Sequence, residues 1–259
     1  MDRIAIDFGI VKIYWYSICI FLGIITALTL IYRESKREKI DSEFLTNLAF
    51  YSVLLGILGA RIYYVLFNID YYIGNPLEIL EVWNGGLAIH GGLLTGLIVT
   101  LIYCKKNKVN SLKMLDIIVV GVIVAQAIGR WGNFFNGEAF GNVTTLSNLK
   151  SQFIPEFIID GMYIMGEYRQ PTFLYESILC LIGFSVMIIL RKNKNLKTGM
   201  LTGFYLIWYG LIRVIIESMR SDSLMLGPIK IAQLVSIIFI ICGIIIEIKS
   251  KNNMLYKNK

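Results

Sequence analysis

The chain has 259 residues, of which 56% are hydrophobic and 17% charged, and its mean hydropathy is +0.65. This composition excludes an ordinary soluble domain and indicates a polytopic membrane protein, because so apolar a core would need a larger polar shell than the chain provides. The formal net charge of +7 could point to nucleic acid. The basic residues are concentrated in short segments between apolar stretches, however, which is typical of membrane topology and predicts no nucleic-acid partner.

Seven apolar stretches follow one another along the chain, each near the length of about 20 residues that a membrane-spanning helix needs. They cover residues 13–32, 44–67, 86–104, 114–135, 172–190, 199–219 and 229–248. The predicted fold class is therefore an all-α polytopic membrane protein, with residues 1–259 in a single integral membrane domain.

Four basic segments decide the predicted orientation. RESKREK, KKNKVNSLK and RKNKNLK lie at residues 33–39, 105–113 and 191–197, and the fourth segment starts at Lys249. They alternate with connections that are poor in Lys and Arg, so the positive-inside rule places them in the cytoplasm and the N-terminus outside. The first residues lack the pattern of a cleaved signal peptide, and we expect the first span to direct insertion.

Two outer connections, residues 68–85 and 136–171, are predicted to form a small extracytoplasmic cap. The first contains NPLE at residues 75–78, a pattern that starts a short helix. In the second, the Asp160-Gly161 pair between apolar runs predicts a hairpin. The second connection is too short for a separate domain but long enough to cover or gate a cavity in the membrane.

Few residues of the sequence could bind a metal ion. The only histidine is His90, which rules out a site with several histidine ligands from one chain. Four cysteines lie in or at the end of apolar runs without a CxxC pattern, and they are Cys19, Cys104, Cys180 and Cys242. We interpret them as small packing residues and expect neither a metal site nor a disulfide.

Ionisable residues inside the predicted spans gather near the outer ends of those spans. One face of the sixth span carries, at helical spacing, Tyr209, Arg213, Glu217 and Arg220. Three further residues lie at the same predicted level, namely Arg61, His90 and Arg130. The face of the sixth span alone could be a ladder of ion pairs that eases insertion. Taken together, so many cationic groups with few acids would repel one another unless an anion joined them.

A lipid phosphate is the anion that this pattern favours. The planar guanidinium group can donate to two phosphate oxygens at once. His90 lies in GGLAIHGG (85–92), where the glycines leave space beside the imidazole. A lone histidine is more often structural, but beside arginines it is a candidate general base because imidazole exchanges protons near neutral pH. We therefore predict a lipid-phosphate site reached from the outer leaflet.

Five segments carry a resemblance to a known family. They are GARIYYVLF (59–67), GGLAIHGG (85–92), GRWGNFFNGEAFG (129–141), QPTFLYES (170–177) and YGLIRVIIESMR (209–220). With them the sequence resembles, nearly end to end, the bacterial phosphatidylglycerol–prolipoprotein diacylglyceryl transferases, which catalyse the first step of lipoprotein maturation. The third segment is the signature of this family.

The resemblance implies a reaction between two membrane-bound partners, phosphatidylglycerol and a preprolipoprotein with a lipobox cysteine. The cysteine sulfur would attack the diacylglyceryl carbon that is bonded to the phosphate oxygen, form a thioether and release glycerol phosphate. No metal or organic cofactor is implied. The implied location is the bacterial cytoplasmic membrane, crossed several times.

The resemblance also implies roles for individual residues. Arg130 and Arg213 would hold the phosphate, His90 would be the candidate base, and Tyr209 would orient the headgroup. Three residues of the signature match lipid-binding positions, with glycerol hydroxyls as the partners of the first two, and they are Asn133, Glu138 and Gly141. Four residues would support the site from behind, and they are Tyr16, Arg61, Glu217 and Arg220.

One position departs from the family pattern. Members commonly have His-Pro where this chain has Gln170-Pro171. Proton transfer by that histidine is therefore absent here or replaced by hydrogen bonding of the glutamine. If His90 only orients the headgroup, the thiol proton would go to Glu138, Glu217 or water, and the sequence does not decide among these.

Two other functions are compatible with arginines inside a membrane. A lipid or anion transporter would place polar groups in both halves of the membrane and often contains repeated halves, whereas here the polar groups crowd one side and no repeat is visible. A structural or receptor protein would use the charges only for helix packing. In that case Arg130→Ala would damage stability rather than turnover.

Overall fold

The computed structural model describes residues 3–9, 12–221, 225–226 and 229–256. The chain is mostly helical and divides into two compact units. Unit 1 comprises residues 1–31 and 116–259, and unit 2 comprises residues 32–115. The fold class predicted from the sequence, a helical polytopic membrane protein, is confirmed at this level, because the described residues include six helices that are long and apolar enough to cross a membrane.

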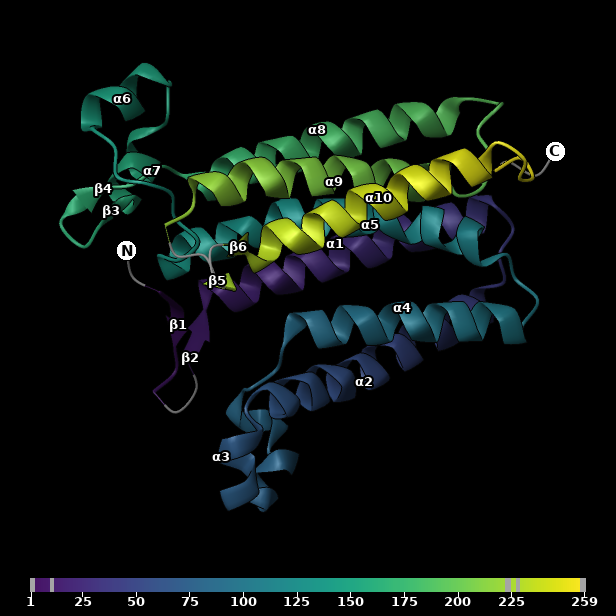
Figure 1. The fold of residues 1–259 in the computed structure, drawn as a ribbon, viewed down its shortest axis with the longest axis horizontal. Helices are drawn as coiled ribbons and strands as arrows, with labels where there is room; N and C mark the ends of the chain where they lie inside the picture. The colour runs from purple at the N-terminus through teal and green to yellow at the C-terminus, as the bar shows by residue number, and fades with distance from the viewer. Residues whose placement is uncertain (1–2, 10–11, 222–224, 227–228, 257–259) are drawn as a thin grey trace. The chain divides into compact units, whose positions relative to one another are not determined.

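Five long helices form the body of unit 1, and in Figure 1 they run in roughly the same direction or its reverse. They are α1 (Trp15–Arg37), α5 (Ser111–Asn136), α8 (Thr172–Lys192), α9 (Met200–Met219) and α10 (Ile231–Ser250). Residues 32–37 of α1 and 111–115 of α5 belong to unit 2. Helices α9 and α10 approach closely at Gly203 and Gly243, because a Cβ atom on Gly243 would lie 2.8 Å from the Gly203 carbonyl oxygen. Small residues at such crossings are typical of helices that pack within a membrane.

A carboxylate from α5 fixes the first turn of α9. The buried Asp116 side chain accepts hydrogen bonds from the backbone N–H groups of Gly199 (2.6 Å) and Thr202 (2.8 Å) and from the Thr202 hydroxyl (2.6 Å). The free N–H groups at the start of a helix need such acceptors when they are buried. Asp116 therefore fixes the start of α9 against α5.

The segment that follows α10 returns to the connection between α8 and α9. Tyr256 is fully buried and its backbone N–H donates to the carbonyl of Leu196 (2.7 Å). The backbone N–H of Thr198 donates to the carbonyl of Met254 (3.0 Å), and Lys197 pairs with Leu255 as an antiparallel bridge. These contacts close the end of unit 1 that lies opposite the short elements between α5 and α8 (Figure 1).

The connection between α5 and α8 folds over a small hydrophobic core of its own. Its elements are α6 (Leu146–Ser151), α7 (Glu156–Gly161), β3 (Tyr163–Ile164) and β4 (Glu167–Tyr168). The core residues are Phe134, Leu149, Ile154, Ile158, Ile159, Met162 and Phe173. The predicted hairpin at Asp160-Gly161 is wrong, because this pair ends α7, whose isoleucines are buried in the core. The hairpin turn is formed instead by Met165 and Gly166, between β3 and β4.

Two further antiparallel pairs of strands belong to unit 1. Strands β1 (Ile4–Asp7) and β2 (Lys12–Tyr14) precede α1, and β5 (Met225–Leu226) and β6 (Ile229–Lys230) precede α10. The Lys230 ammonium group donates to carbonyls at the C-terminal end of α9, those of Glu217 (2.6 Å) and of the C-cap residue Arg220 (2.8 Å). A cation at this position satisfies free carbonyls and complements the helix dipole.

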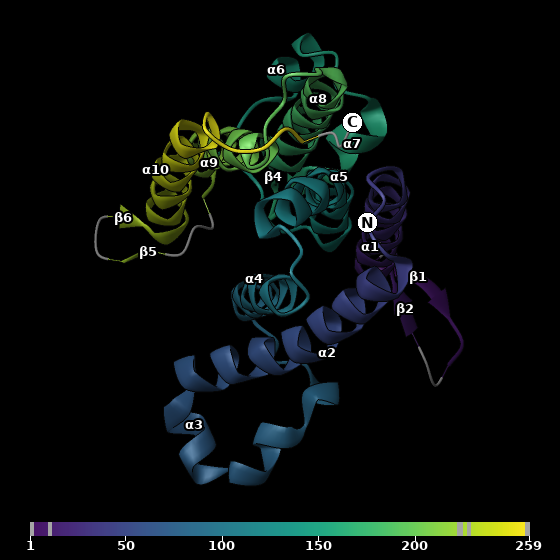
Figure 2. The same cartoon turned by 90° about the vertical axis from the view of Figure 1, so that its right-hand side faces the viewer.

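Unit 2 contains a pair of long helices and a short cap. The helices are α2 (Ser42–Phe67) and α4 (Ile89–Lys106), and between them lie α3 (Ile69–Gly74) and the 3-10 turns η1 (Pro76–Leu80) and η2 (Val82–Asn84). Both views of the ribbon show α2 beside α4, with the cap at one end of the pair (Figures 1 and 2). The two helices touch at glycines, since a Cβ atom on Gly91 would lie 2.5 Å from the Gly59 carbonyl oxygen.

Six of the seven predicted ranges correspond to the helices that could cross a membrane, α1, α2, α5, α8, α9 and α10. The remaining range, residues 86–104, is the third along the chain and corresponds to α4, which is not among the six. Its 18 residues include His90, three glycines and two terminal lysines, which lower its apolar character.

Candidate functional site

Two arginines from different helices of unit 1 converge on one buried carboxylate. Arg130 lies on α5, Glu176 on α8 and Arg213 on α9. The Nη2 atom of Arg130 is 2.8 Å from Glu176 Oε1, and the Nη1 atom of Arg213 is 3.2 Å from Glu176 Oε2. The side chain of Glu176 is 3% exposed, whereas those of Arg130 and Arg213 are 20% and 13% exposed. Each carboxylate oxygen thus faces one guanidinium group.

The predicted polar face of α9 continues this cluster. Arg213 Nη2 donates to Glu217 Oε2 at 2.6 Å, and Arg220 Nη1 lies 3.7 Å from the same oxygen. The ladder of residues 213, 217 and 220 expected from helical spacing is therefore present. It does not end on α9, because Glu176 links it to Arg130 across three helices.

Arg130 is the centre of the hydrogen bonds around the cluster. Its Nη1 donates to Asn133 Oδ1 (3.2 Å) and its Nη2 to the Tyr209 hydroxyl (3.2 Å). Asn133 in turn donates from Nδ2 to Glu138 Oε1 (2.8 Å). The buried Nε of Arg130 has no hydrogen-bond partner among the residues that the structure describes. One donor of this guanidinium is thus unused within the described chain.

The signature segment turns sharply after α5. Gly137 (φ 65°) and Ala139 (φ 57°) both lie in the left-handed region, and the Glu138 N–H donates back to the Asn133 carbonyl (3.0 Å). This turn brings Glu138 beside Asn133. Gly141 then pairs with Gln170, and a Cβ atom at Gly141 would lie 2.9 Å from the Gln170 Cβ. Close packing of two backbones is therefore sufficient to explain the glycine at position 141.

Tyr16 supports the same region from α1. It packs against α5 at Gly132, where a Cβ atom would come within 3.0 Å of the Tyr16 ring. The structure thus brings eight of the predicted residues into one region of unit 1, together with Gly141: Tyr16, Arg130, Asn133, Glu138, Tyr209, Arg213, Glu217 and Arg220.

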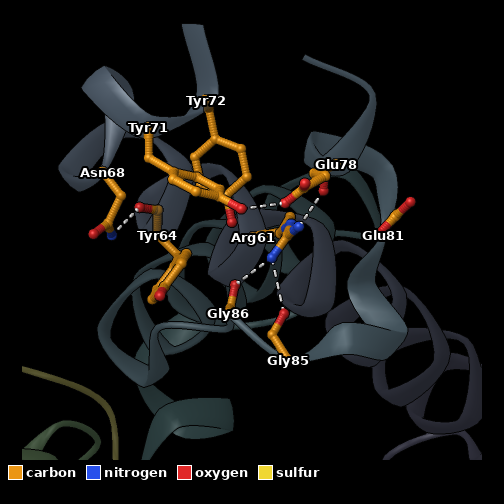
Figure 3. Close-up of a pocket in the computed structure, with 9 residues that line it drawn as sticks. All are labelled: Arg61, Tyr64, Asn68, Tyr71, Tyr72, Glu78, Glu81, Gly85 and Gly86. Atoms are coloured by element: carbon orange, nitrogen blue, oxygen red, sulfur yellow. Dashed lines mark hydrogen bonds between the residues drawn. The ribbon is translucent and has the colours of Figure 1, made fainter. Parts of the chain in front are cut away.

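Arg61 differs from the arginines of unit 1, because it is bound by backbone carbonyls of its own unit. It is buried on α2 and donates from Nε to the Ile79 carbonyl (2.9 Å) and from Nη1 to those of Gly85 (2.8 Å) and Gly86 (3.1 Å). Its Nη2 donates to the Glu78 carbonyl. The guanidinium therefore fastens the cap between α2 and α4, as Figure 3 shows.

Arg61 also borders a cavity of about 410 Å³ in unit 2. Its lining residues, drawn in Figure 3, include Tyr64, Asn68, Tyr71, Tyr72, Glu78 and Glu81. The Tyr71 hydroxyl donates to Glu78 Oε2 at 2.7 Å. This hydrogen bond to a carboxylate raises the pKa of Tyr71 above its ordinary value.

His90 lies at the start of α4, and its residue is exposed. Its ring is 6.4 Å from that of Tyr63, centroid to centroid, at an interplanar angle of 31°. His90 and Arg61 belong to unit 2, whereas the arginine cluster belongs to unit 1. The sequence predicts all these cations at one level. The arginine cluster itself is formed by residues of unit 1.

Glu176 is the residue of the cluster that sequence reasoning missed. It stands in the apolar run FLYESILC, where a single carboxylate was a visible signal. The expectation that the cations would have few acidic partners is wrong for unit 1, because Glu176 and Glu217 both pair with its arginines. No group of three or more His, Cys, Asp or Glu side chains within the described part of the chain is arranged to hold a metal ion.

Fold and cluster together define a class of protein: a polytopic helical membrane protein with an arginine–carboxylate site buried among its helices. A family model described as prolipoprotein diacylglyceryl transferase matches residues 3–249. Relatives named phosphatidylglycerol–prolipoprotein diacylglyceryl transferase, from Streptococcus pneumoniae strains Taiwan19F-14 and JJA, are each 48% identical over 249 residues. These alignments cover 96% of this chain and 94% of each relative. The chain belongs to the prolipoprotein diacylglyceryl transferase family and is a membrane-bound transferase.

Proposed function

We propose that this chain transfers the sn-1,2-diacylglyceryl group of phosphatidylglycerol to the thiol of a lipobox cysteine in a preprolipoprotein. The sulfur attacks the glyceryl carbon bonded to the phosphate oxygen, and the carbon–oxygen bond breaks as the carbon–sulfur bond forms. Glycerol phosphate leaves with the bonding electron pair. The thiol proton passes to a base, because the thiolate is the reactive nucleophile.

The convergence of Arg130 and Arg213 on Glu176 carries this proposal. Two guanidinium groups that already share one carboxylate are placed to share a phosphate in the same way. Negative charge grows on the phosphate oxygen as the leaving group departs. Fixed arginine donors in a site of low dielectric constant would stabilise that charge without reorganising.

The neighbouring residues fit the remaining tasks. Tyr209, held by Arg130, would orient the headgroup, and Asn133 with Glu138 would bind the glycerol hydroxyls by exchanging their mutual hydrogen bond for the substrate. Tyr16, Glu217 and Arg220 would support the arginines, and Gly141 would keep the signature turn against residue 170. Arg61 would act by holding the cap. His90 is the proposed base, with Glu138, Glu217 or water as the other acceptors of the thiol proton.

The proposed topology has seven spans, of which α4 is the third and the shortest. The N-terminus lies outside and the C-terminus in the cytoplasm. The four basic segments support this orientation through the positive-inside rule. The proposed location is the bacterial cytoplasmic membrane, where both substrates are membrane-bound. The short elements between α5 and α8 would then cover the extracytoplasmic end of unit 1.

The test uses purified protein in detergent with phosphatidylglycerol and a lipobox peptide. Mass spectrometry should detect the diacylglyceryl-modified peptide together with released glycerol phosphate, and Arg130→Ala should give neither product. His90→Gln should lower turnover by about a hundredfold, the scale of general base catalysis, while lipid binding changes less than twofold. Unchanged turnover would remove the base role from His90. Lipid movement in vesicles by folded protein that forms no thioether would favour the transporter.

A further inference from the structure

A hydrogen-bonded pair of polar side chains, Gln126 and Tyr205, lies one helical turn from the arginine cluster, towards the N-terminal ends of α5 and α9. Gln126 is one helical turn before Arg130 on α5, and Tyr205 is one turn before Tyr209 on α9. Gln126 Nε2 donates to the Tyr205 hydroxyl at 3.0 Å. The rings of Tyr205 and Tyr209 are stacked, with centroids 5.8 Å apart and planes 3° apart. The pair therefore joins the same two helices as Arg130 and Tyr209, one turn further along each.

This pair has hydrogen-bonding capacity that the described part of the chain does not use. A glutamine amide and a phenol together carry three polar hydrogens, and their mutual bond uses one of them. The Gln126 Oε1 atom is buried and has no partner among the described residues. Whichever way the amide is turned, a donor from Gln126 or Tyr205 remains for a ligand.

Such a pair is costly between membrane helices if it only fills space. Tyr205 is 8% exposed, and a polar group in hydrocarbon is penalised unless its bonds are satisfied. Asp116 already holds the start of α9 through three hydrogen bonds, and Arg130 on α5 donates to Tyr209 on α9, so the fold does not need the pair to position α9. The polar hydrogens that the mutual bond leaves over, on Gln126 and Tyr205, would suit a ligand with acceptor atoms at this depth.

We propose that Gln126 and Tyr205 form a subsite for an acyl-ester carbonyl of the lipid, one helical turn below the phosphate site. This inference rests on the proposed function, in which Arg130 and Arg213 hold the phosphate. One turn advances about 5.4 Å along the helix, and in a diacyl phospholipid the ester carbonyls lie at that scale below the phosphate, towards the acyl chains. The carbonyl oxygen accepts from Tyr205 or Gln126, and the glyceryl carbon is thereby held beneath the leaving phosphate.

The experiment compares two lipids that share the phosphate, the headgroup and the reacting carbon. One is diacyl phosphatidylglycerol, and the other is its dialkyl ether analogue, which lacks the carbonyl acceptors. The parent protein should use the diester about three- to tenfold more efficiently in kcat/KM, the scale of one or two neutral hydrogen bonds. In Tyr205→Phe and Gln126→Leu this preference should fall to less than twofold, through loss of diester activity alone.

Ser185→Ala is the matched control, because the Ser185 hydroxyl bonds only to the Leu181 carbonyl of its own helix α8 among the described residues. It should keep the preference of the parent protein. An equal fall of both lipids in Tyr205→Phe and Gln126→Leu would assign the pair to helix packing and overturn the subsite. Equal use of both lipids by the parent protein would also overturn it. Absence of product from either lipid would instead refute the proposed function.

Discussion

The arginines of the two units are held in opposite ways. Arg130 and Arg213 in unit 1 pair with the side-chain carboxylate of Glu176. Arg61 in unit 2 donates to four backbone carbonyls, from Glu78, Ile79, Gly85 and Gly86, which cannot leave without unfolding the cap. A carboxylate partner can give way to an anionic ligand, whereas a set of carbonyls fixes a loop. We therefore expect Arg130 and Arg213 to serve a ligand site and Arg61 to hold the cap.

The largest expected effect separates the two kinds of arginine by turnover. Arg130→Lys should lower peptide modification by about a thousandfold, because a point charge cannot replace a fork that holds phosphate and Tyr209 together. Arg61→Lys should keep turnover within about tenfold, since its role is to hold the cap. Both are measured by the mass-spectrometric assay on protein whose folding has been checked. Comparable losses in the two variants would abolish the distinction.

The next effect concerns the shared carboxylate. Glu176→Gln leaves the two arginines without their common buried partner and should destabilise the protein by about 3 kcal/mol, seen as a lower Tm in detergent. Glu167→Gln is the control, because Glu167 pairs with Arg169 at 2.8 Å but its side chain is 51% exposed. Its Tm should change little.

Phosphatidylglycerol should restore part of the Tm that Glu176→Gln loses, because it supplies an anion to the two arginines. An equal rise in Tm with a zwitterionic lipid would argue against a phosphate site.

A smaller and local effect is expected in unit 2. Arg61→Gln removes most of the bonds that fasten residues 78–86, so hydrogen exchange of the cap should become faster, by an amount that corresponds to about 2 kcal/mol of local opening. Exchange in α8 and α9 should not change. Faster exchange throughout unit 1 would show that Arg61 supports more than the cap.

The smallest effect tests the space beside Arg61. Gly86 has φ 66° and a Cβ atom there would clash with Arg61 Nη1. Gly86→Ala should therefore destabilise the cap by about 1 kcal/mol or more, measured by the same exchange experiment. Gly74→Ala is the control in the same cap, because its Cβ atom would have nothing within 4 Å. Equal behaviour of the two variants would contradict the packing around the guanidinium.

The sequence predicted the parts of the molecule that depend on local pattern. Apolar length located six of the helices within a few residues, and helical spacing placed Arg213, Glu217 and Arg220 on one face. The sequence did not predict which residues from distant segments would be hydrogen-bond or ion-pair partners. Glu176 has no local pattern that would link it to Arg130, and the carbonyls around Arg61 come from a loop 17–25 residues away. The Asp160-Gly161 turn failed because burial of Ile158 and Ile159 extended α7 over a sequence that locally favours a bend.

The return of residues 253–256 to the connection between α8 and α9 orders events during synthesis. Leu196 and Thr198 leave the ribosome well before their partners Met254 and Tyr256 exist. Until then this connection lacks the segment that pairs with it, although α8 and α9 can already be in the membrane. Assembly of unit 1 is therefore completed from its last segment, and a premature stop before Asn253 would leave the arginine site built but the opposite end open to cellular proteases.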